Sequence, residues 1–441
     1  MRSIYVLVAS CCVLGTSATA RQSGVAKTSN AGLSAQVPNS SPQDPQVVEQ
    51  QVGTLLHEGR YLAAIRLIER ADPAGASEEL RWSYRQLRPA LDGIVVPRGE
   101  PADNAPAADG EAVARYQEAI AKDAISEIVQ RAKKTRVVII NETHDNPRDR
   151  AFVLAVAEAL RPLGYNVYAA EGFTNFPGVD GKPQVQRLIA DGYARYDTGF
   201  YMVDPMFAYL VRRVLQLGYR PLPYEYAPPP EKMAAYASAS ADESIALREQ
   251  GEAENLARAI AAAPPGEKFL VHVGYSHAAE RPVGPEGHQH EWMAARLARL
   301  TGIDPLTIDQ TGLSEYDANP RVRALYARLV PRVGNSPKVF LTDGQATISG
   351  QMNGAVDLQV VHPPIEMIGG RPNWLQRTDR RAVRVPSRLL PKKGSRLVQV
   401  FVVGEASDAV PVDQVLVTAG REAPLVYLPP DKKVRWAVQD D

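Results

Sequence analysis

The middle of the chain alternates between short apolar runs and longer amphipathic stretches. TRVVIIN (135–141) is a continuous apolar run, and residues 147–164 after it place apolar side chains at helical spacing. The same pair of patterns recurs, with further apolar runs at YNVYAAEGF (165–173), RPLPYEY (220–226), EKFLVHVGYSH (267–277) and PLTIDQT (305–311). Continuous apolar strands separated by helices predict a Rossmann-like α/β domain over residues 111–378, with a mainly parallel sheet covered by helices on both faces.

Two different patterns flank this predicted domain. Residues 47–96 repeat apolar side chains at helical spacing, and Gly59 divides them, which predicts a small helical hairpin module packed on the main domain. Residues 385–441 carry apolar strands separated by turns, which predicts a small antiparallel, sandwich-like β domain. Residues 21–46 and 97–110 are rich in small and polar residues and proline, so we expect them to be linkers.

The first 20 residues have the pattern of an export signal. A basic start precedes the apolar run IYVLVASCCVLG, and small residues lead to a cleavage site after Ala20. We therefore expect a periplasmic or secreted protein; the residues before Cys11 fit a lipoprotein signal poorly. Both cysteines lie inside this segment, so the mature chain would contain no disulfide and no thiol ligand. No other segment is long and apolar enough for a membrane helix.

Composition narrows the range of partners. The 441 residues allow two or three domains, and the 50 basic and 50 acidic side chains balance at a pI near 7.1. This balance gives no support for nucleic-acid binding. We expect a small-molecule ligand instead.

Ionisable side chains follow four of the predicted strands. The carboxyl ends of parallel strands meet at one edge of a sheet, so we expect these groups to share one crevice. They are Glu142, His144 and Asp145 in NETHDN, Glu171 in AAEGF, Glu225 and Tyr226 in YEY, and Tyr275 and His277 in GYSH. Clustered glutamate and histidine side chains are typical of metal ligation or of general acid–base catalysis. His272 lies inside its strand, where it is either a core histidine with a bonded ring or a site residue.

These motifs carry a resemblance to a known superfamily. NETHDN, AAEGF, the pair Arg248 and Asn255 in REQGEAENLA, and HVGYSH resemble the superfamily that joins erythromycin esterases, ChaN haem-binding proteins and TIKI-type metalloproteases. The resemblance covers roughly residues 130–315. Asn141 stands where the family motif has glycine, and Asn also tolerates tight-turn geometry.

The resemblance implies a hydrolase whose catalytic residues are Glu142, His144, Glu171, His277 and Arg248. Two mechanisms remain open. In one, the two glutamates and two histidines bind a divalent metal that activates water. In the other, a histidine or glutamate deprotonates water directly while Arg248 stabilises an oxyanion.

Five further side chains are predicted to bind substrate. They are Asp145, Arg148, Tyr226, Asn255 and Tyr275. Arg148 either binds an anionic group of the substrate or pairs with Asp145 or Asp149.

The alternative function is haem binding of the ChaN type without hydrolysis. An aromatic stretch would line such a pocket or serve an ester substrate equally well; its members are Tyr193, Tyr196, Phe200 and Tyr201. His288 and His290 in the following loop are additional candidate ligands, although such loop histidines are more often simply exposed.

Overall fold

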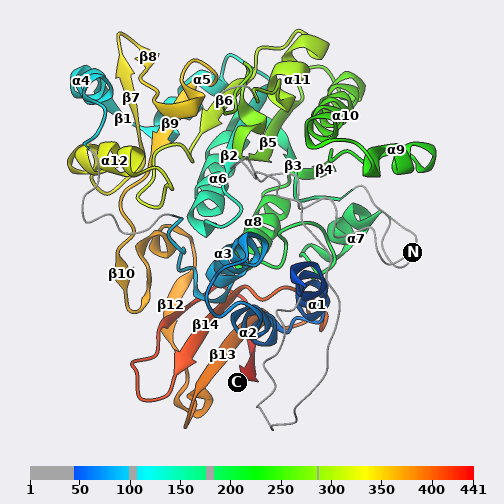
Figure 1. The fold of residues 1–441 in the computed structure, drawn as a ribbon, viewed down its shortest axis with the longest axis vertical. Coiled ribbons are helices and arrows are strands. Elements are labelled where there is room, and N and C mark those ends of the chain that lie inside the picture. Colours follow the sequence, from blue (N-terminus) through cyan, green and yellow to red (C-terminus); the bar gives the residue numbers. More distant parts are fainter. Residues whose placement is uncertain (1–43, 99–106, 175–182, 286–287) are drawn as a thin grey trace, which may run out of the picture.

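The computed structural model describes residues 44–98, 107–174, 183–285 and 288–441 (Figure 1). The predicted signal peptide and most of both predicted linkers lie outside the described residues. In the part of the chain that is described, no helix combines the length and apolar character needed to cross a bilayer.

A mixed sheet forms the centre of the protein. Six neighbouring strands are parallel, and an antiparallel edge adds β1, β7 and the short β8 (Gln345–Ala346). The mainly parallel sheet is confirmed, whereas the antiparallel edge was not predicted. From one edge to the other the strands are β1 (Ile120–Asp123), β7 (Lys338–Thr342), β9 (Leu358–Val361), β6 (Leu306–Asp309), β2 (Val137–Glu142), β5 (Lys268–Gly274), β3 (Tyr165–Ala170) and β4 (Arg220–Pro223).

Helices cover both faces of this sheet. Alternate residues of β2 point to opposite sides, so Val138 and Ile140 join one apolar core while Val137 and Ile139 join another. The first core includes α5 (Ala124–Ala132), α6 (Pro147–Leu160) and α8 (Pro205–Gln216), and the second includes α10 (Ala241–Ala262) and α11 (Met293–Thr301). The remaining helices of this region are α4 (Gly110–Glu118), α7 (Gln184–Asp191), α9 (Met233–Ala237) and α12 (Pro320–Val333), with short 3-10 turns η2 (Arg161–Leu163), η3 (Pro230–Lys232), η4 (Tyr275–Ala278) and η5 (Gly350–Met352).

The N-terminal module contains three helices rather than a hairpin of two. They are α1 (Pro45–His57), α2 (Tyr61–Ala71) and α3 (Glu78–Asp92). Gly59 separates the first two with a φ of 71°, and a Cβ there would lie 2.5 Å from the Tyr196 ring, so only glycine fits this turn. The module packs on the main domain, where the Tyr61 hydroxyl donates to the Val203 carbonyl at 2.7 Å.

The C-terminal region forms separate antiparallel sheets, as the sequence predicts. The strands are β12 (Arg381–Arg384) with β15 (Leu425–Leu428), and β14 (Asp413–Thr418), β13 (Ser395–Val402) and β16 (Val434–Asp440), besides the short pair β10 (Met367–Ile368) and β11 (Arg371–Pro372). The turns η6 (Asn373–Arg377) and η7 (Ser387–Leu389) connect them.

The two terminal modules meet. Figure 1 places α2 and α3 beside β13 and β14. Gln414 donates to the Ala90 carbonyl at 2.7 Å, and the Leu62 amide donates to Gln439 at 3.0 Å. The helical module therefore bridges the α/β domain and the β region.

Candidate functional site

The first half of the site lies at the end of β2. His144 Nδ1 lies 3.1 Å from Glu142 Oε1, and Arg150 donates to both Glu142 oxygens at 2.8 Å. Asn146 caps α6 and Pro147 opens it, so the first turn of this helix carries Arg150 back toward the strand end. Burial opposes ionisation of Glu142, but Arg150 and His272 outweigh it and hold the pKa of this acid well below its usual value. Glu142 is therefore a firmly charged partner for His144.

The second half comes from β5 and α10. His277 follows β5 in η4, and its Nδ1 lies 2.9 Å from Glu249 Oε1 and 3.5 Å from Glu252 Oε2. The Met293 amide also donates to Glu249, at 2.7 Å. The sequence analysis did not identify Glu249 or Glu252, although their spacing of three puts them on one helical face with Arg248 close by.

Glu171 joins the two halves. Its Oε1 lies 3.9 Å from the Nε2 atoms of both His144 and His277. Its Oε2 accepts a hydrogen bond from the amide of Gly274, where an added Cβ would lie 2.6 Å from His144 Nε2. The structure thus brings together the two histidines and two glutamates that the sequence singled out, because β2, β5 and β3 are neighbours in the sheet.

Arg248 is held by acids. Its guanidinium donates to Glu171 at 2.7 Å and to both Glu225 oxygens at 2.9 and 2.7 Å, and it lies 2.9 Å from Glu252. To stabilise an oxyanion, as the sequence analysis predicts, Arg248 would have to give up its contacts with these carboxylates. Burial raises the pKa of Glu252 well above its usual value, so this acid keeps its proton to higher pH than an exposed glutamate.

Two tyrosines in strained backbone conformations enclose His144. Tyr201 stacks on the imidazole at 3.9 Å between ring centroids, and Tyr275 meets it edge-on at 5.1 Å. Their φ angles are 60° and 34°, a region that non-glycine residues seldom occupy and that is concentrated at functional sites. His144 Nε2 is buried and makes no hydrogen bond to the described residues. The imidazole is fixed on every side except at the nitrogen that faces Glu171.

His272 has a supporting position. Its Nδ1 lies 2.8 Å from the Tyr168 hydroxyl, and its Nε2 lies 3.0 Å from Glu142 Oε2. The sequence left two interpretations of His272 open. The structure agrees with the first, a core histidine with a hydrogen-bonded ring, and its Nε2 contacts Glu142.

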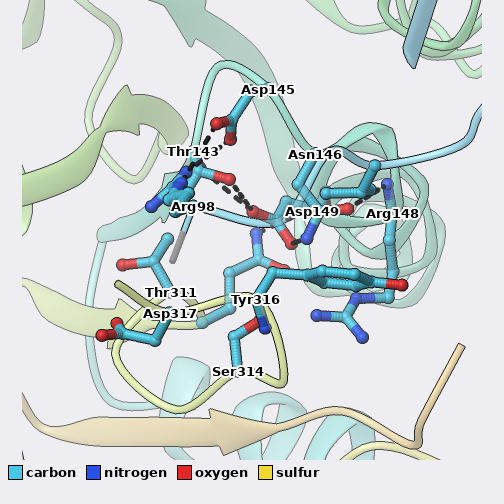
Figure 2. Close-up of a pocket in the computed structure, with 12 residues that line it drawn as sticks. Arg98, Thr143, Asp145, Asn146, Arg148, Asp149, Thr311, Ser314, Tyr316 and Asp317 are labelled. Carbon is cyan, nitrogen blue, oxygen red and sulfur yellow. Dashed lines mark hydrogen bonds and ion pairs between the residues drawn. The ribbon is translucent and has the colours of Figure 1, made fainter. Parts of the chain in front are cut away.

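Asp145 and Arg148 line a polar recess next to the NETHDN loop (Figure 2). Asp145 pairs with Arg98, and Arg148 pairs with Glu315 at 3.2 Å rather than with either neighbouring aspartate. The recess encloses about 310 Å³ including open solvent. Burial raises the pKa of Asp149, which lines it, to about 7.

The other predicted substrate residues have local contacts. Asn255 donates to the Tyr224 carbonyl at 2.9 Å, and the Tyr226 ring packs so closely on Gly251 that a Cβ there would lie 2.1 Å away. Both side chains hold the segment after β4 against α10. Tyr275, in contrast, touches His144 directly.

Most of the predicted haem-pocket aromatics and the loop histidines lie elsewhere. Tyr196 packs on Tyr61 at 5.9 Å, and Tyr193 accepts from the Ala406 amide at 3.0 Å. His288 and His290 lie 3.8 and 3.5 Å from Asp242. Of the stretch, Tyr201 is the residue with a contact to His144.

Two groups of side chains have the donor atoms for a cation. In one group among the described residues, Glu249, Glu252 and His277 each offer a ligand atom, and these three atoms all lie within 4.8 Å of one another. The predicted set shares His277 with this group, but Glu142 has its oxygens occupied by Arg150 and His272. The Nε2 atoms of both histidines with Glu171 offer the donor types of the second group, but among the described residues only the first group has all its ligand atoms within 4.8 Å of one another.

Comparison with known proteins yields only weak structural similarity. No family model matches the chain, and no curated protein matches it. A structure described as "Bacterial protein toxins" aligns with 61% of this chain and 57% of its own length, at 14% identity and a TM-score of 0.33. RRSP, a MARTX toxin effector domain from Vibrio vulnificus, aligns with 57% of this chain and 54% of its own length, at 16% identity and a TM-score of 0.31. The chain thus spans little more than half the length of these structures, and such TM-scores do not establish a common fold.

Proposed function

We propose that the protein is an exported hydrolase of the erythromycin esterase/ChaN-like type, with a Rossmann-like sheet and His144 as the group that activates water. One observation carries the proposal. The Nε2 atoms of His144 and His277 face the same Glu171 oxygen at 3.9 Å, while a buried glutamate holds the Nδ1 atom of each ring.

The hydrogen bonds assign roles within the His144 half. A charged Glu142 accepts the Nδ1 proton of His144, which leaves the lone pair of Nε2 directed into the site. This is the arrangement by which an acid orients a histidine base. Nε2 then takes a proton from water, the oxygen of that water attacks the carbonyl carbon of an ester or peptide, and the imidazolium returns the proton to the leaving group.

The same side chains offer the donor types of a divalent-cation site. Ligand atoms bound at about 2.1 Å in a tetrahedral site lie roughly 3.4 Å apart, so the 3.9 Å separations would need to contract by about half an ångström. His144 Nε2, His277 Nε2 and Glu171 would hold the ion, and Glu142 and Glu249 would orient the imidazoles. A bound divalent cation would lower the pKa of a water molecule.

Haem binding has less support. Tyr201 covers one face of His144, and Tyr193 and Tyr196 are engaged away from the site. The hydrolase is therefore the function that we propose.

The test compares hydrolysis of a panel of neutral aryl esters by the mature chain with hydrolysis by Glu142→Gln and His144→Ala. Both substitutions are expected to lower kcat by at least about 10²-fold, because each removes a member of one acid–base pair. Glu158→Gln, an exposed acid on α6, is the matched control. Metal analysis and an absorption spectrum of the same samples report a bound divalent cation or haem.

Retention of activity in both variants would contradict the proposal. A Soret band lost in His144→Ala, without turnover of any ester, would replace it with haem binding.

A further inference from the structure

The helical N-terminal module reaches the neighbourhood of His144. Trp82 on α3 lies 6.2 Å from the ring of Tyr275, which is itself 5.1 Å from His144. The Arg85 guanidinium lies 5.6 Å over the Trp82 ring, and the Arg98 guanidinium lies 5.6 Å from the Tyr275 ring. Two aromatic rings and two guanidinium groups from separate segments therefore meet beside the candidate base.

The two arginines differ in their partners. Arg98 pairs with Asp145 through its Nε and Nη2 atoms, as Figure 2 shows. Arg85 makes no ion pair with the described residues, and its Nε is buried without a hydrogen bond. Burial lowers the pKa of Arg85, and the charge of Arg98 lowers it further against the opposing pull of Asp145. Asp145 and Asp149 both act on Arg98, so of the two guanidiniums it is Arg85 that has no ion pair with the described residues.

The other charged groups described nearby interact with Arg98 or with the backbone, and none of them forms an ion pair with Arg85. Arg81 is exposed on the same helix and donates to the Gly75 carbonyl at 3.0 Å. Asp317 lies in the recess of Figure 2 and interacts with Arg98, and burial raises the pKa of this acid above its usual value. A guanidinium that is partly removed from water and has no ion-pair partner is a favourable place for an anionic ligand.

We propose that Trp82, Arg85 and Arg98 form an anion subsite beside His144, which selects substrates that carry a carboxylate or phosphate near the scissile bond. This inference rests on the proposed hydrolytic function of the adjacent site. The guanidinium of Arg85 binds the anion, while the rings of Trp82 and Tyr275 flank the apolar part of the substrate.

The kinetic test compares a neutral aryl ester with the same ester bearing a carboxylate on its acyl chain. Arg85→Gln is expected to raise KM for the anionic ester about tenfold and to leave the neutral ester unchanged, since one charge-assisted hydrogen bond is lost. Arg81→Gln, one turn earlier on α3, is the matched control and is expected to change neither value. Equal effects of Arg85→Gln on both esters would overturn the subsite.

Binding without turnover separates this inference from the proposed function. Benzoate and phenyl phosphate are titrated calorimetrically into the mature chain, Arg85→Gln and His144→Ala. Binding that persists in His144→Ala and weakens about tenfold in Arg85→Gln supports the subsite even if no ester is hydrolysed. Ester hydrolysis with no anion binding, or with binding unaffected by Arg85→Gln, leaves the hydrolase standing and overturns the subsite. The stronger of the two probes identifies the anion as carboxylate or phosphate.

Discussion

The two histidine–glutamate pairs of the site are alike in geometry and differ in how the acids around them are paired with arginine. Glu142, the partner of His144, has its own guanidinium, since Arg150 donates to both of its oxygens. Arg150 also pairs with Asp204, at 3.2 Å, but with no acid of the His277 half. The acids around His277 have no guanidinium that serves one of them alone. Glu171, Glu225 and Glu252 all lie within 3 Å of one guanidinium, that of Arg248.

The pKa values of Glu142 and Glu252 follow this difference in pairing with arginine. The pKa of Glu142 lies well below its usual value, whereas burial drives the pKa of Glu252 well above it. Acid–base sites commonly separate two similar groups in this way, with one kept charged and the other kept protonated. For the proposed hydrolase, this comparison favours His144 as the base and Glu252 as the acid that keeps its proton to higher pH.

The largest expected effect is a difference between the two histidines. His144→Ala is expected to lower kcat on a neutral ester by about 10⁴-fold, because it removes the base, and His277→Ala by about 10²-fold, because it removes a supporting group. Steady-state kinetics on the mature chain measures both. His57→Ala, an exposed histidine on α1, is expected to have no effect.

Equal losses of kcat in the two variants would show that His144 and His277 do not have different roles. If both also lost a stoichiometric divalent metal, the two imidazoles would be ligands of one ion rather than base and support.

The next effect concerns the guanidinium that belongs to one half alone. Arg150→Met is expected to lower the free energy of unfolding by about 3–5 kcal/mol, because it leaves both Glu142 and Asp204 buried without their shared cation. Urea denaturation measures the change. Arg131→Met removes a partly exposed pair with Glu127 and is expected to cost less than about 1 kcal/mol. Similar costs for the two variants would mean that Glu142 is not firmly charged.

The positions of the strand-end groups were predictable from sequence, and their partners were not. Glu142, Glu171 and His277 each follow an apolar run, and a parallel sheet brings the ends of neighbouring runs to one edge. Their charge partners, in contrast, depend on how helices pack across that edge. Arg150 and Glu249 lie on helices, and the sequence alone does not show whether these side chains face the site or the solvent.

Contacts between distant segments were also beyond the sequence patterns. A hydrophobic repeat in residues 47–96 predicts helices but not what they cover, so nothing marked Trp82 as a neighbour of Tyr275. Likewise, the apolar runs of β7 and β9 do not specify their antiparallel pairing at the sheet edge.

A smaller effect tests how tightly His144 is placed. Gly274→Ala would put a Cβ 2.6 Å from His144 Nε2 and 2.9 Å from Glu171 Oε2, so both side chains must shift. Since misplacement of about 1 Å costs on the order of 10² in rate, we expect that loss in kcat, with overpacking lowering stability by about 1–3 kcal/mol. Gly53→Ala, which has open space around it in α1, is the control. An unchanged kcat would show that the position of His144 is not critical.

The smallest effect is a dependence on pH that has opposite signs in the two halves. The folded-state pKa of Glu252 lies above the unfolded value of about 4.3, so its stabilising contribution is present below that value and is lost as pH rises toward the folded pKa. Glu142 behaves oppositely, since its depressed pKa gives a stabilising contribution that is present above the unfolded value and is lost in acid.

Glu252→Gln keeps a neutral side chain at all pH values. Relative to the wild type, its Tm is therefore expected to be roughly 2 °C higher at pH 8 than at pH 5, whereas the relative Tm of Glu142→Gln should be lower at pH 8 than at pH 4. Glu254→Gln, exposed on the same helix, controls for the loss of an acid from α10. The same sign in both halves would remove the charge difference between them, and His144 and His277 would then have equal claims to be the base.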